Sequence, residues 1–333
     1  MKKWEDDGFF IGEDDFYEAV HGGVLSRFAG DHIRHDYFES FDGKRIGYFY
    51  AKNPEEKAAI VILHGFCEFV NKFYETMYYF YCCGYSVYFI EHRGHGASDR
   101  SLPELEQELD KVHVVSYEEY VEDLHIFMEN IVKPGSTSGR LYMFAHSMGG
   151  TIGSLYNEEY PNDFDKAVLS SPMHKVYFKG MPDWIVNLIV FLAKTLRWDL
   201  RYSPTQHGFK GVECDFSTSN SMLSEARFNY AYQCRVDNPR YSTFGGTYGW
   251  LIAGIEATKK ILENADKYKT PTLLAQAGRD NMVDVAGQEA FLKRVPSAKK
   301  VQFPESKHEI FDATTEIRRD YFRKLLEFYG EED

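Results

Sequence analysis

The sequence predicts an α/β protein with a mostly parallel sheet, helices on both faces and a helical cap inserted late in the chain. Short β-rich runs alternate with longer helical patterns, which is typical of parallel βαβ units. Some of these runs, such as AIVIL at residues 59–63, are apolar throughout, as expected of strands that are buried on both faces. The alternation stops between about residues 172 and 265, a stretch that is too long for a structureless loop.

Eight strands are expected in this sheet. The Asp42-Gly43 dipeptide marks a hairpin turn that joins two early strands. The later strand candidates are residues 58–65, 85–94, 141–147, 166–172, 270–278 and 299–306. Helical patterns occupy the positions of crossover helices, at residues 71–84, 116–132, 148–161 and 285–295.

The break in the alternation divides the chain into a core and an insertion. We assign residues 1–172 and 262–333 to the core, and residues 173–261 to a cap inserted after the sixth strand. An amphipathic helical pattern runs from about Trp184 to Trp198. The insertion is also rich in aromatic residues, including Phe209, Phe216, Tyr230, Tyr232, Tyr248 and Trp250.

The formal net charge of the 333-residue chain is -13. This charge argues against a nucleic acid as partner and against binding of anionic lipid through bulk charge. Much of the excess is local, and we expect both acidic clusters to be solvated surface. They comprise Glu5, Asp6, Asp7, Glu13, Asp14, Asp15 and Glu18 near the start, and Glu104, Glu106, Glu108 and Asp110.

Cysteine usage and the N-terminus predict a cytoplasmic protein. The five cysteines are odd in number and include the adjacent pair Cys82 and Cys83, which does not resemble a disulfide framework. The first residues contain no apolar stretch of the kind found in secretion signals. The most apolar run, IVNLIVFLA at 185–193, is too short to span a bilayer. We expect it to be a buried or interfacial helix, with peripheral contact at a membrane surface.

Ser147 is the candidate nucleophile. It lies in LYMFAHSMGGT (141–151), between a strand-like run and a helix-like run, in the order that a nucleophile elbow requires. The chain passes close to its neighbours in such an elbow, so small residues are needed two before and two after the serine. Ala145 and Gly149 meet that requirement.

A serine hydroxyl needs a histidine to take its proton and a carboxylate to orient that histidine. In an elbow-based fold the base follows the last strand, and His308 is the only histidine after His207. The acid follows the preceding strand, where Asp280 and Asp284 compete. Asp280 comes directly after the strand and is assigned as the acid, whereas Asp284 is well placed as a helix N-cap.

Backbone N–H groups are expected to bind the oxyanion of a tetrahedral intermediate. One donor is the residue after the nucleophile, Met148. The second comes from the loop after an early strand, His64-Gly65-Phe66, and Phe66 N–H is the candidate.

Other candidate sites are weaker. His92 and His95 have a spacing that some metal sites use, but they lie in a glycine-rich loop without an obvious third ligand. Cys67 lies near the predicted oxyanion loop, but no histidine arrangement favours it over Ser147. No dinucleotide or P-loop motif occurs. We therefore predict neither a metal nor a cofactor.

The chain resembles the α/β-hydrolase superfamily over about residues 40–328, and specifically its monoacylglycerol lipase and bacterial lysophospholipase branch. The motifs that carry the resemblance are HGFCE (64–68), EHRGHGAS (91–98), AHSMGG (145–150), SPM (171–173), GGTYGW (245–250), TPTLLAQAGRDNMVD (270–284) and HEI (308–310). It implies the α/β-hydrolase fold, a triad of Ser147, Asp280 and His308, and oxyanion donors at Phe66 and Met148. Glu91 departs from the family, which usually has Asp there.

The resemblance implies a serine hydrolase of single-chain lipid esters, acting on a lysophospholipid or a monoacylglycerol through an acyl-enzyme. The small-molecule lipid is then the partner, and we expect the cap to contact a membrane surface transiently. One alternative keeps the triad in an aminopeptidase, with cap acids such as Glu213, Asp215 and Glu225 facing the substrate amine, or in an esterase for small soluble esters. Another is a non-catalytic binding protein that retains the fold.

Overall fold

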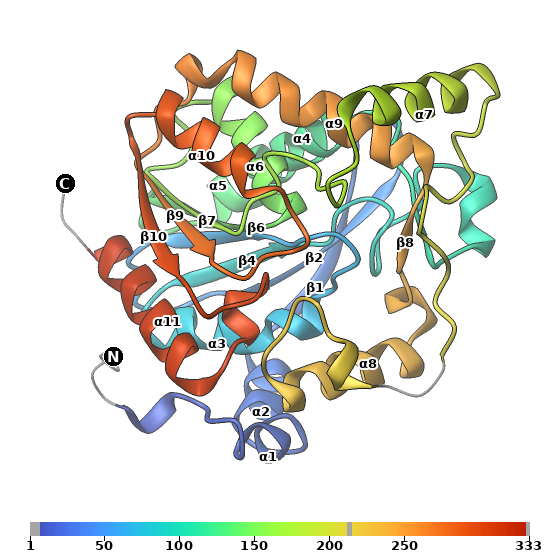
Figure 1. Ribbon diagram of the computed structural model, residues 1–333. Helices are drawn as coiled ribbons and strands as arrows, with labels where there is room; N and C mark the ends of the chain where they lie inside the picture. Colours follow the sequence, from blue (N-terminus) through green and yellow to red (C-terminus); the bar gives the residue numbers. More distant parts are fainter. Residues whose placement is uncertain (1–6, 212–214, 331–333) are drawn as a thin grey trace.

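An eight-stranded sheet runs through the middle of the molecule, in the order β1-β2-β4-β3-β6-β7-β9-β10 (Figure 1). The computed structural model describes residues 7–211 and 215–330. The six strands β4, β3, β6, β7, β9 and β10 pair in parallel, and β1 and β2 add antiparallel strands at the β4 edge. Their bounds are β1 (Arg34–Glu39), β2 (Arg45–Ala51), β3 (Ala59–Leu63), β4 (Ser86–Ile90), β6 (Leu141–His146), β7 (Lys166–Ser170), β9 (Thr272–Ala277) and β10 (Ala298–Phe303).

Side-chain burial follows the position of each strand in the sheet. Every residue of β3, β4, β6 and β7 is buried, because helices cover both faces of these central strands. At the edges, β1 and β10 are mostly exposed or half-buried. The predicted strands and the mostly parallel α/β fold are therefore confirmed, including the hairpin at Asp42-Gly43 that joins β1 to β2.

Helices cover both faces of the sheet and create two hydrophobic clusters (Figure 1). One cluster includes side chains of α4, α6, α9 and α10, and the other includes side chains of α1, α2, α3 and α11. These helices are α1 (Phe16–Val20), α2 (Val24–Asp31), α3 (Tyr74–Cys82), α4 (Tyr117–Phe127), α6 (Met148–Glu159), α9 (Tyr248–Glu263), α10 (Val285–Arg294) and α11 (Thr315–Gly330). A π-helical turn, Met128–Val132, and the short α5 (Lys133–Gly135) continue α4.

The segment between β7 and β9 contains α7 (Asp183–Thr195), α8 (Glu225–Asp237) and α9. A two-stranded ladder of β5 (Lys111–Val112) and β8 (Gly245–Gly246) ties this segment to the loop before α4. α9 packs on α6, and its buried side chains share a cluster with the central strands. The division at residues 173–261 remains a prediction. From this packing we propose that the cap ends before α9.

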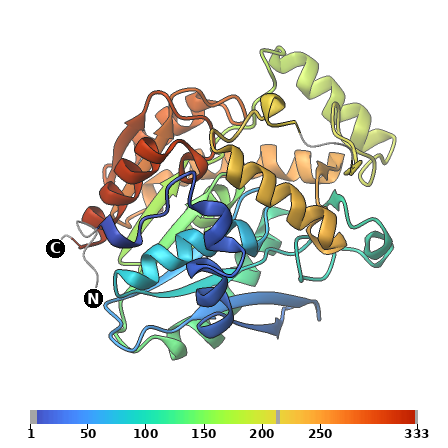
Figure 2. The ribbon, with the colours of Figure 1, turned by 90° about the horizontal axis from the view of Figure 1, so that it is seen from below.

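The segment before β1 packs against α3 and α8 (Figure 2). This packing changes the expectation that all acids near the start of the chain are solvated. Asp14, Asp15 and Glu18 are exposed, as expected of a solvated acidic cluster. Glu13 is instead bonded to α8: its carboxylate accepts hydrogen bonds from Ala226 N–H and the Ser224 hydroxyl. Glu5 and Asp6, which belong to the same predicted cluster, lie outside the described residues.

Two further observations concern helices and cysteines. Among the described residues, no helix has the length and apolar character needed to cross a membrane. Cys67, Cys83 and Cys234 are free thiols.

Candidate active site

Ser147 occupies a strained turn between β6 and α6. Its backbone has φ 51° and ψ -114°, a conformation that a residue with a side chain rarely adopts. Backbone hydrogen bonds hold the turn: Ser147 N–H donates to Ser170 O at 3.1 Å, and Ser147 O accepts from Gly150 N–H and Met173 N–H, each at 2.9 Å, and from Thr151 N–H at 3.3 Å. The chain therefore keeps Ser147 in the geometry of a nucleophile elbow.

The glycines after Ser147 are required by close packing. A Cβ at Gly149 would lie 2.2 Å from the Leu63 carbonyl oxygen at the end of β3. A Cβ at Gly150 would lie 2.5 Å from Pro172 Cβ. Because neither contact is tolerable, the first turn of α6 can approach β3 and the 170–173 loop only with glycine at both positions.

His308 and Asp280 lie together after β10 and β9. His308 Nδ1 is 2.7 Å from Asp280 Oδ2, and their side chains are 5% and 0% exposed. The other oxygen, Asp280 Oδ1, accepts from Met282 N–H at 2.8 Å and Val283 N–H at 3.2 Å. Since a carboxylate only accepts hydrogen bonds, His308 Nδ1 carries a hydrogen and donates it to Asp280. His308 Nε2 is therefore left as the basic nitrogen.

The electrostatics of this pair suit a base and its orienting acid. Burial lowers the pKa of His308, but the charge and hydrogen bond of Asp280, together with the charges of Glu309 and Glu68, raise it overall. Burial raises the pKa of Asp280, but His308 and the two backbone N–H groups lower it overall. Asp284 instead caps α10 by accepting from Ala286 N–H at 2.9 Å, and it pairs with Lys175.

The elbow, the histidine loop and the loop after β3 meet at the carboxyl edge of the sheet. The rings of His146 and His308 are 4.8 Å apart, which places His308 beside the elbow. A Cβ at Gly65 would lie 3.1 Å from Ser147 Cβ, so the His64-Gly65-Phe66 loop packs directly on Ser147. Parallel strands bring these distant segments together because their carboxyl ends share one edge.

The two predicted oxyanion donors have free N–H groups. Within residues 7–211 and 215–330, neither Phe66 N–H nor Met148 N–H donates a hydrogen bond. His64 orients the first of them: its Nδ1 donates to Gly65 O at 2.7 Å, and its Nε2 accepts from His92 N–H at 3.0 Å. Since Gly65 O and Phe66 N–H belong to one planar peptide, His64 fixes the direction of the Phe66 donor.

His64 and His95 connect the loop after β3 with the loop after β4. His64 is neutral because burial lowers its pKa to about 4. His95 Nε2 accepts from Cys67 N–H at 3.2 Å, which joins the two loops. Cys67 itself is 7% exposed, and burial raises the pKa of its thiol, so it lacks the thiolate character of a nucleophile.

Another group has the spacing of metal ligands: His125, Glu129 and Asp163. The Lys133 ammonium already pairs with both carboxylates, at 2.9 Å for Asp163. Among the described residues, His92 and His95 belong to no cluster of this kind.

Sequence reasoning missed a group of buried charges next to the site. Glu68, Lys72 and Glu309 form two ion pairs between the loop after β3 and the loop that carries His308. The sequence contains a signal for this group: Glu68 and Lys72 are four residues apart in the largely apolar stretch GFCEFVNKF, and Glu309 directly follows the predicted base.

Comparison with known proteins places this geometry in a family. The family model described as serine aminopeptidase, S33, matches residues 54–314. The chain is 27% identical to a probable lysophospholipase L2 of Haemophilus influenzae, over 88% of this chain and 93% of that protein. It is 25% identical to a monoacylglycerol lipase of Mycolicibacterium smegmatis, over 83% of this chain and 90% of that protein.

A solved structure supports the fold. A soluble variant of monoglyceride lipase from Saccharomyces cerevisiae, in complex with a substrate analog, superimposes with a TM-score of 0.66. The two chains are 18% identical, and the match covers 89% of this chain and 95% of that one. The predicted resemblance to the monoacylglycerol lipase and lysophospholipase branch is confirmed.

Proposed function

Because the chain belongs to the serine aminopeptidase S33 family of α/β-hydrolases, we propose that it is a serine hydrolase that cleaves carboxylic esters of single-chain lipids. The substrate is a lysophospholipid or a monoacylglycerol. The observation that carries this proposal is the 2.7 Å contact between His308 and Asp280 beside a serine with φ 51°. Relatives named lysophospholipase and monoacylglycerol lipase support a lipid ester as substrate.

In the first half of the reaction, Ser147 attacks the ester carbonyl while His308 Nε2 takes its proton. Asp280 keeps the proton of Nδ1 in place and stabilises the imidazolium that forms. The free N–H groups of Phe66 and Met148 bind the oxygen that becomes negative in the tetrahedral intermediate. The imidazolium then protonates the departing alcohol, and an acyl-enzyme remains.

In the second half, His308 takes a proton from water, which attacks the acyl carbonyl. The second tetrahedral intermediate uses the same two N–H donors, and its collapse releases the fatty acid and restores Ser147. Ser147 is only 7% exposed, so the site shields this chemistry from bulk solvent.

The cap provides the contact with a lipid surface in this proposal. α7 exposes large apolar side chains at positions i, i+4, i+7, i+8 and i+12, which form one helix face: Trp184, Leu188, Phe191, Leu192 and Leu196. Exposed basic residues also occur within α7 and close to it in the sequence, although the whole chain is acidic: Lys179, Lys194, Arg197 and Arg201. An exposed apolar helix face with basic residues nearby suits an interface with anionic lipid.

The acids named for an aminopeptidase give that alternative no support. Asp215 is solvated and accepts a hydrogen bond from Ser217 N–H. Glu225 is exposed in the first turn of α8. Glu213 lies outside the described residues.

A fluorophosphonate probe and a panel of substrates test the proposal. The wild type should react with the probe, and Ser147→Ala should not. In the panel, lysophosphatidylcholine and monoacylglycerols should be hydrolysed faster than short p-nitrophenyl esters or aminoacyl-naphthylamides. Preference for aminoacyl substrates would establish the aminopeptidase instead. A wild type that does not react with the probe would favour the non-catalytic binding protein.

A further inference from the structure

A buried bridge of three charges joins the two loops that hold the catalytic groups. Lys72 Nζ lies 2.7 Å from Glu68 Oε1 and 2.6 Å from Glu309 Oε2. The three side chains are 4%, 4% and 10% exposed, so the bridge is inside the protein. We call Glu68, Lys72 and Glu309 the Lys72 bridge.

One end of the bridge holds the oxyanion loop. Glu68 Oε2, the oxygen that does not face Lys72, accepts from Gly65 N–H at 2.5 Å. Gly65 is the residue that packs on Ser147 Cβ, and the next peptide carries the Phe66 N–H donor. A shift of Glu68 would therefore move the oxyanion donor relative to Ser147.

The other end of the bridge holds the base, because Glu309 directly follows His308. The backbone of Glu309 is also hydrogen-bonded. Its carbonyl oxygen accepts from Asp312 N–H at 3.0 Å, and its N–H donates to Ser221 O at 2.9 Å. With its carboxylate on Lys72, the residue after the base is fixed through both side chain and backbone.

The bridge is ionised. Burial raises the pKa of Glu309, but the charge and hydrogen bond of Lys72, together with the neighbouring His146 and Ser221, lower it to about 2. The pKa of Glu68 is also lowered by Lys72 against the effect of burial. Burial and the Glu309 charge raise the pKa of Asp312, a further acid near Lys72.

Stability alone does not explain such a bridge. Replacing buried ion pairs with apolar residues of similar volume is often neutral or stabilising, because desolvation offsets the attraction. Directed bonds between charged groups do, however, fix positions more narrowly than apolar contacts. The Lys72 bridge applies this restraint between the two loops that flank Ser147.

We propose that Lys72 is a positioning residue that sets the separation of the oxyanion donor Phe66 N–H and the base His308 across Ser147. This inference rests on the proposed function. Both groups act on the transition state, so a misplaced loop lowers kcat with little effect on KM.

The test compares kcat and KM on a soluble ester, p-nitrophenyl butyrate, with the rate of fluorophosphonate labelling. Lys72→Met should lower kcat and the labelling rate by about 100-fold, the effect of losing one oxyanion donor, and leave KM within about threefold. Lys72→Arg keeps a cation between the two carboxylates and should restore kcat to within about tenfold of the wild type.

Two isosteric variants keep the test valid if Lys72→Met folds poorly. Glu68→Gln and Glu309→Gln should each lower kcat, and the double variant should lower it no further than the worse single variant, because each breaks the same connection. The matched control is Lys166→Met, which removes another buried lysine at the start of β7, far from the carboxyl edge, and should leave kcat unchanged.

The outcomes separate the two proposals. If the wild type reacts with the probe and Lys72→Met retains its kcat, or if the two glutamine variants have additive effects, the positioning role is wrong and the proposed function stands. A wild type that neither labels nor hydrolyses any ester overturns both.

Discussion

The two long helices of the proposed cap, α7 and α8, both have 13 residues, but they contact the rest of the molecule in different ways. α7 is the more apolar helix, yet it projects at the periphery and exposes its large side chains (Figure 2). α8 is the more polar helix, yet two of its arginines reach into the interior. Overall hydrophobicity therefore does not decide which helix is anchored.

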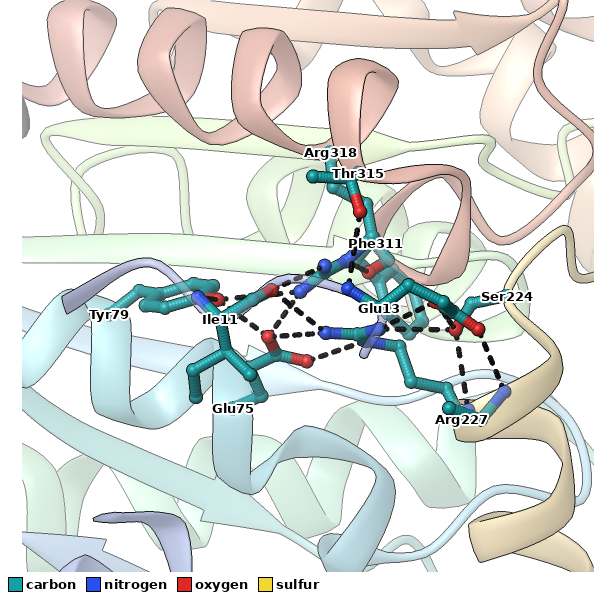
Figure 3. Close-up of polar contacts among 10 residues, drawn as sticks. Ile11, Glu13, Glu75, Tyr79, Ser224, Arg227, Phe311, Thr315 and Arg318 are labelled. Carbon is teal, nitrogen blue, oxygen red and sulfur yellow. Dashed lines mark hydrogen bonds and ion pairs between the residues drawn. The ribbon is translucent and has the colours of Figure 1, made fainter. Parts of the chain in front are cut away.

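Arg227 is the main anchor of α8 (Figure 3). Its guanidinium donates to both oxygens of Glu75 on α3, each at 2.8 Å, and to Ile11 O at 3.2 Å. Arg318 of α11 binds the same Glu75 carboxylate. The partly exposed Glu13 also pairs with Arg227, at 3.1 Å between Glu13 Oε2 and Arg227 Nη1. One buried network thus ties the cap to two core helices and to the segment before β1.

Arg235 is the second anchor. It donates to Cys67 O and Thr243 O, each at 2.7 Å. Among the described residues, α7 makes no comparable contact, and the ion pair between its Lys194 and Glu256 is largely exposed. The difference indicates that directional polar bonds define one position for α8, whereas the large apolar side chains of α7 stay exposed.

The strongest test removes the α8 anchor. Arg227→Met should lower the free energy of unfolding by about 3–5 kcal/mol, because it leaves part of the buried Glu75 charge uncompensated. Urea denaturation measures it. Arg323→Met, which breaks exposed ion pairs of α11, should cost about 1 kcal/mol or less. Equal losses in the two variants would show that α8 is not anchored by this network.

The same anchor should weaken in acid. Burial raises the pKa of Glu75, but Arg227 and Arg318 outweigh it and lower the pKa from 4.5 to about 2. A carboxyl with a lowered folded-state pKa stabilises the protein above its unfolded pKa, and that contribution disappears as the pH falls from 4.5 to about 2. It amounts to about 3 kcal/mol. The unfolding free energies of the wild type and Glu75→Gln should converge as the pH falls through this window. If the two free energies ran parallel with pH, the role of the Glu75 charge would be contradicted.

The second anchor should have a smaller effect. Arg235→Gln removes a charged donor from Cys67 O and Thr243 O, and should cost about 2 kcal/mol in urea denaturation. Gln233→Ala, an exposed position of the same helix, is the control and should change stability by about 0.5 kcal/mol or less. If Arg235→Gln lowered the free energy of unfolding no more than the control, Arg235 would not be an anchor of α8.

The exposed face of α7 should contribute least to stability. Trp184→Ser with Phe191→Ser should change the unfolding free energy by about 1 kcal/mol or less. The same double variant should bind vesicles containing anionic lipid at least about tenfold more weakly in cosedimentation, because two large side chains no longer enter the interface. Hydrolysis of p-nitrophenyl butyrate should be unchanged.

Tyr17→Ser provides the matched control for the vesicle experiment. Tyr17 is 71% exposed, but it belongs to α1 and not to the cap. Its loss should leave vesicle binding unaltered. If both variants bound vesicles equally, or if the α7 variant bound like the wild type, the membrane-facing role of α7 would be refuted.

Local patterns were sufficient for the sheet and for the candidate site. Apolar runs such as residues 59–63 predict central parallel strands because both sides of such a strand must be buried. Ser147 was predicted from the small residues of its turn, and His308 from its position after the last strand. These inferences need only neighbours in sequence and the order of elements along the chain.

The buried charges could not be predicted in the same way. Lys72 and Glu309 are 237 positions apart, and Arg227 and Glu13 are 214 apart. Each residue alone is typical of a solvated surface, which is why Glu13 was expected to be one acid among several. The ion pairs exist only because packing brings the segment before α3 against the His308 loop, and α8 against the segment before β1.

The sequence by itself determined the order of strands and helices, the elbow around Ser147 and the identities of the candidate acid and base. These features depend on the period of apolar residues, on glycine where no Cβ fits and on chain order, all of which are local. Only the tertiary structure decided which charges are buried and paired, and which cap helix is anchored. Burial is a property of the assembled fold, and it determines whether a charged side chain is solvated or holds two distant loops together.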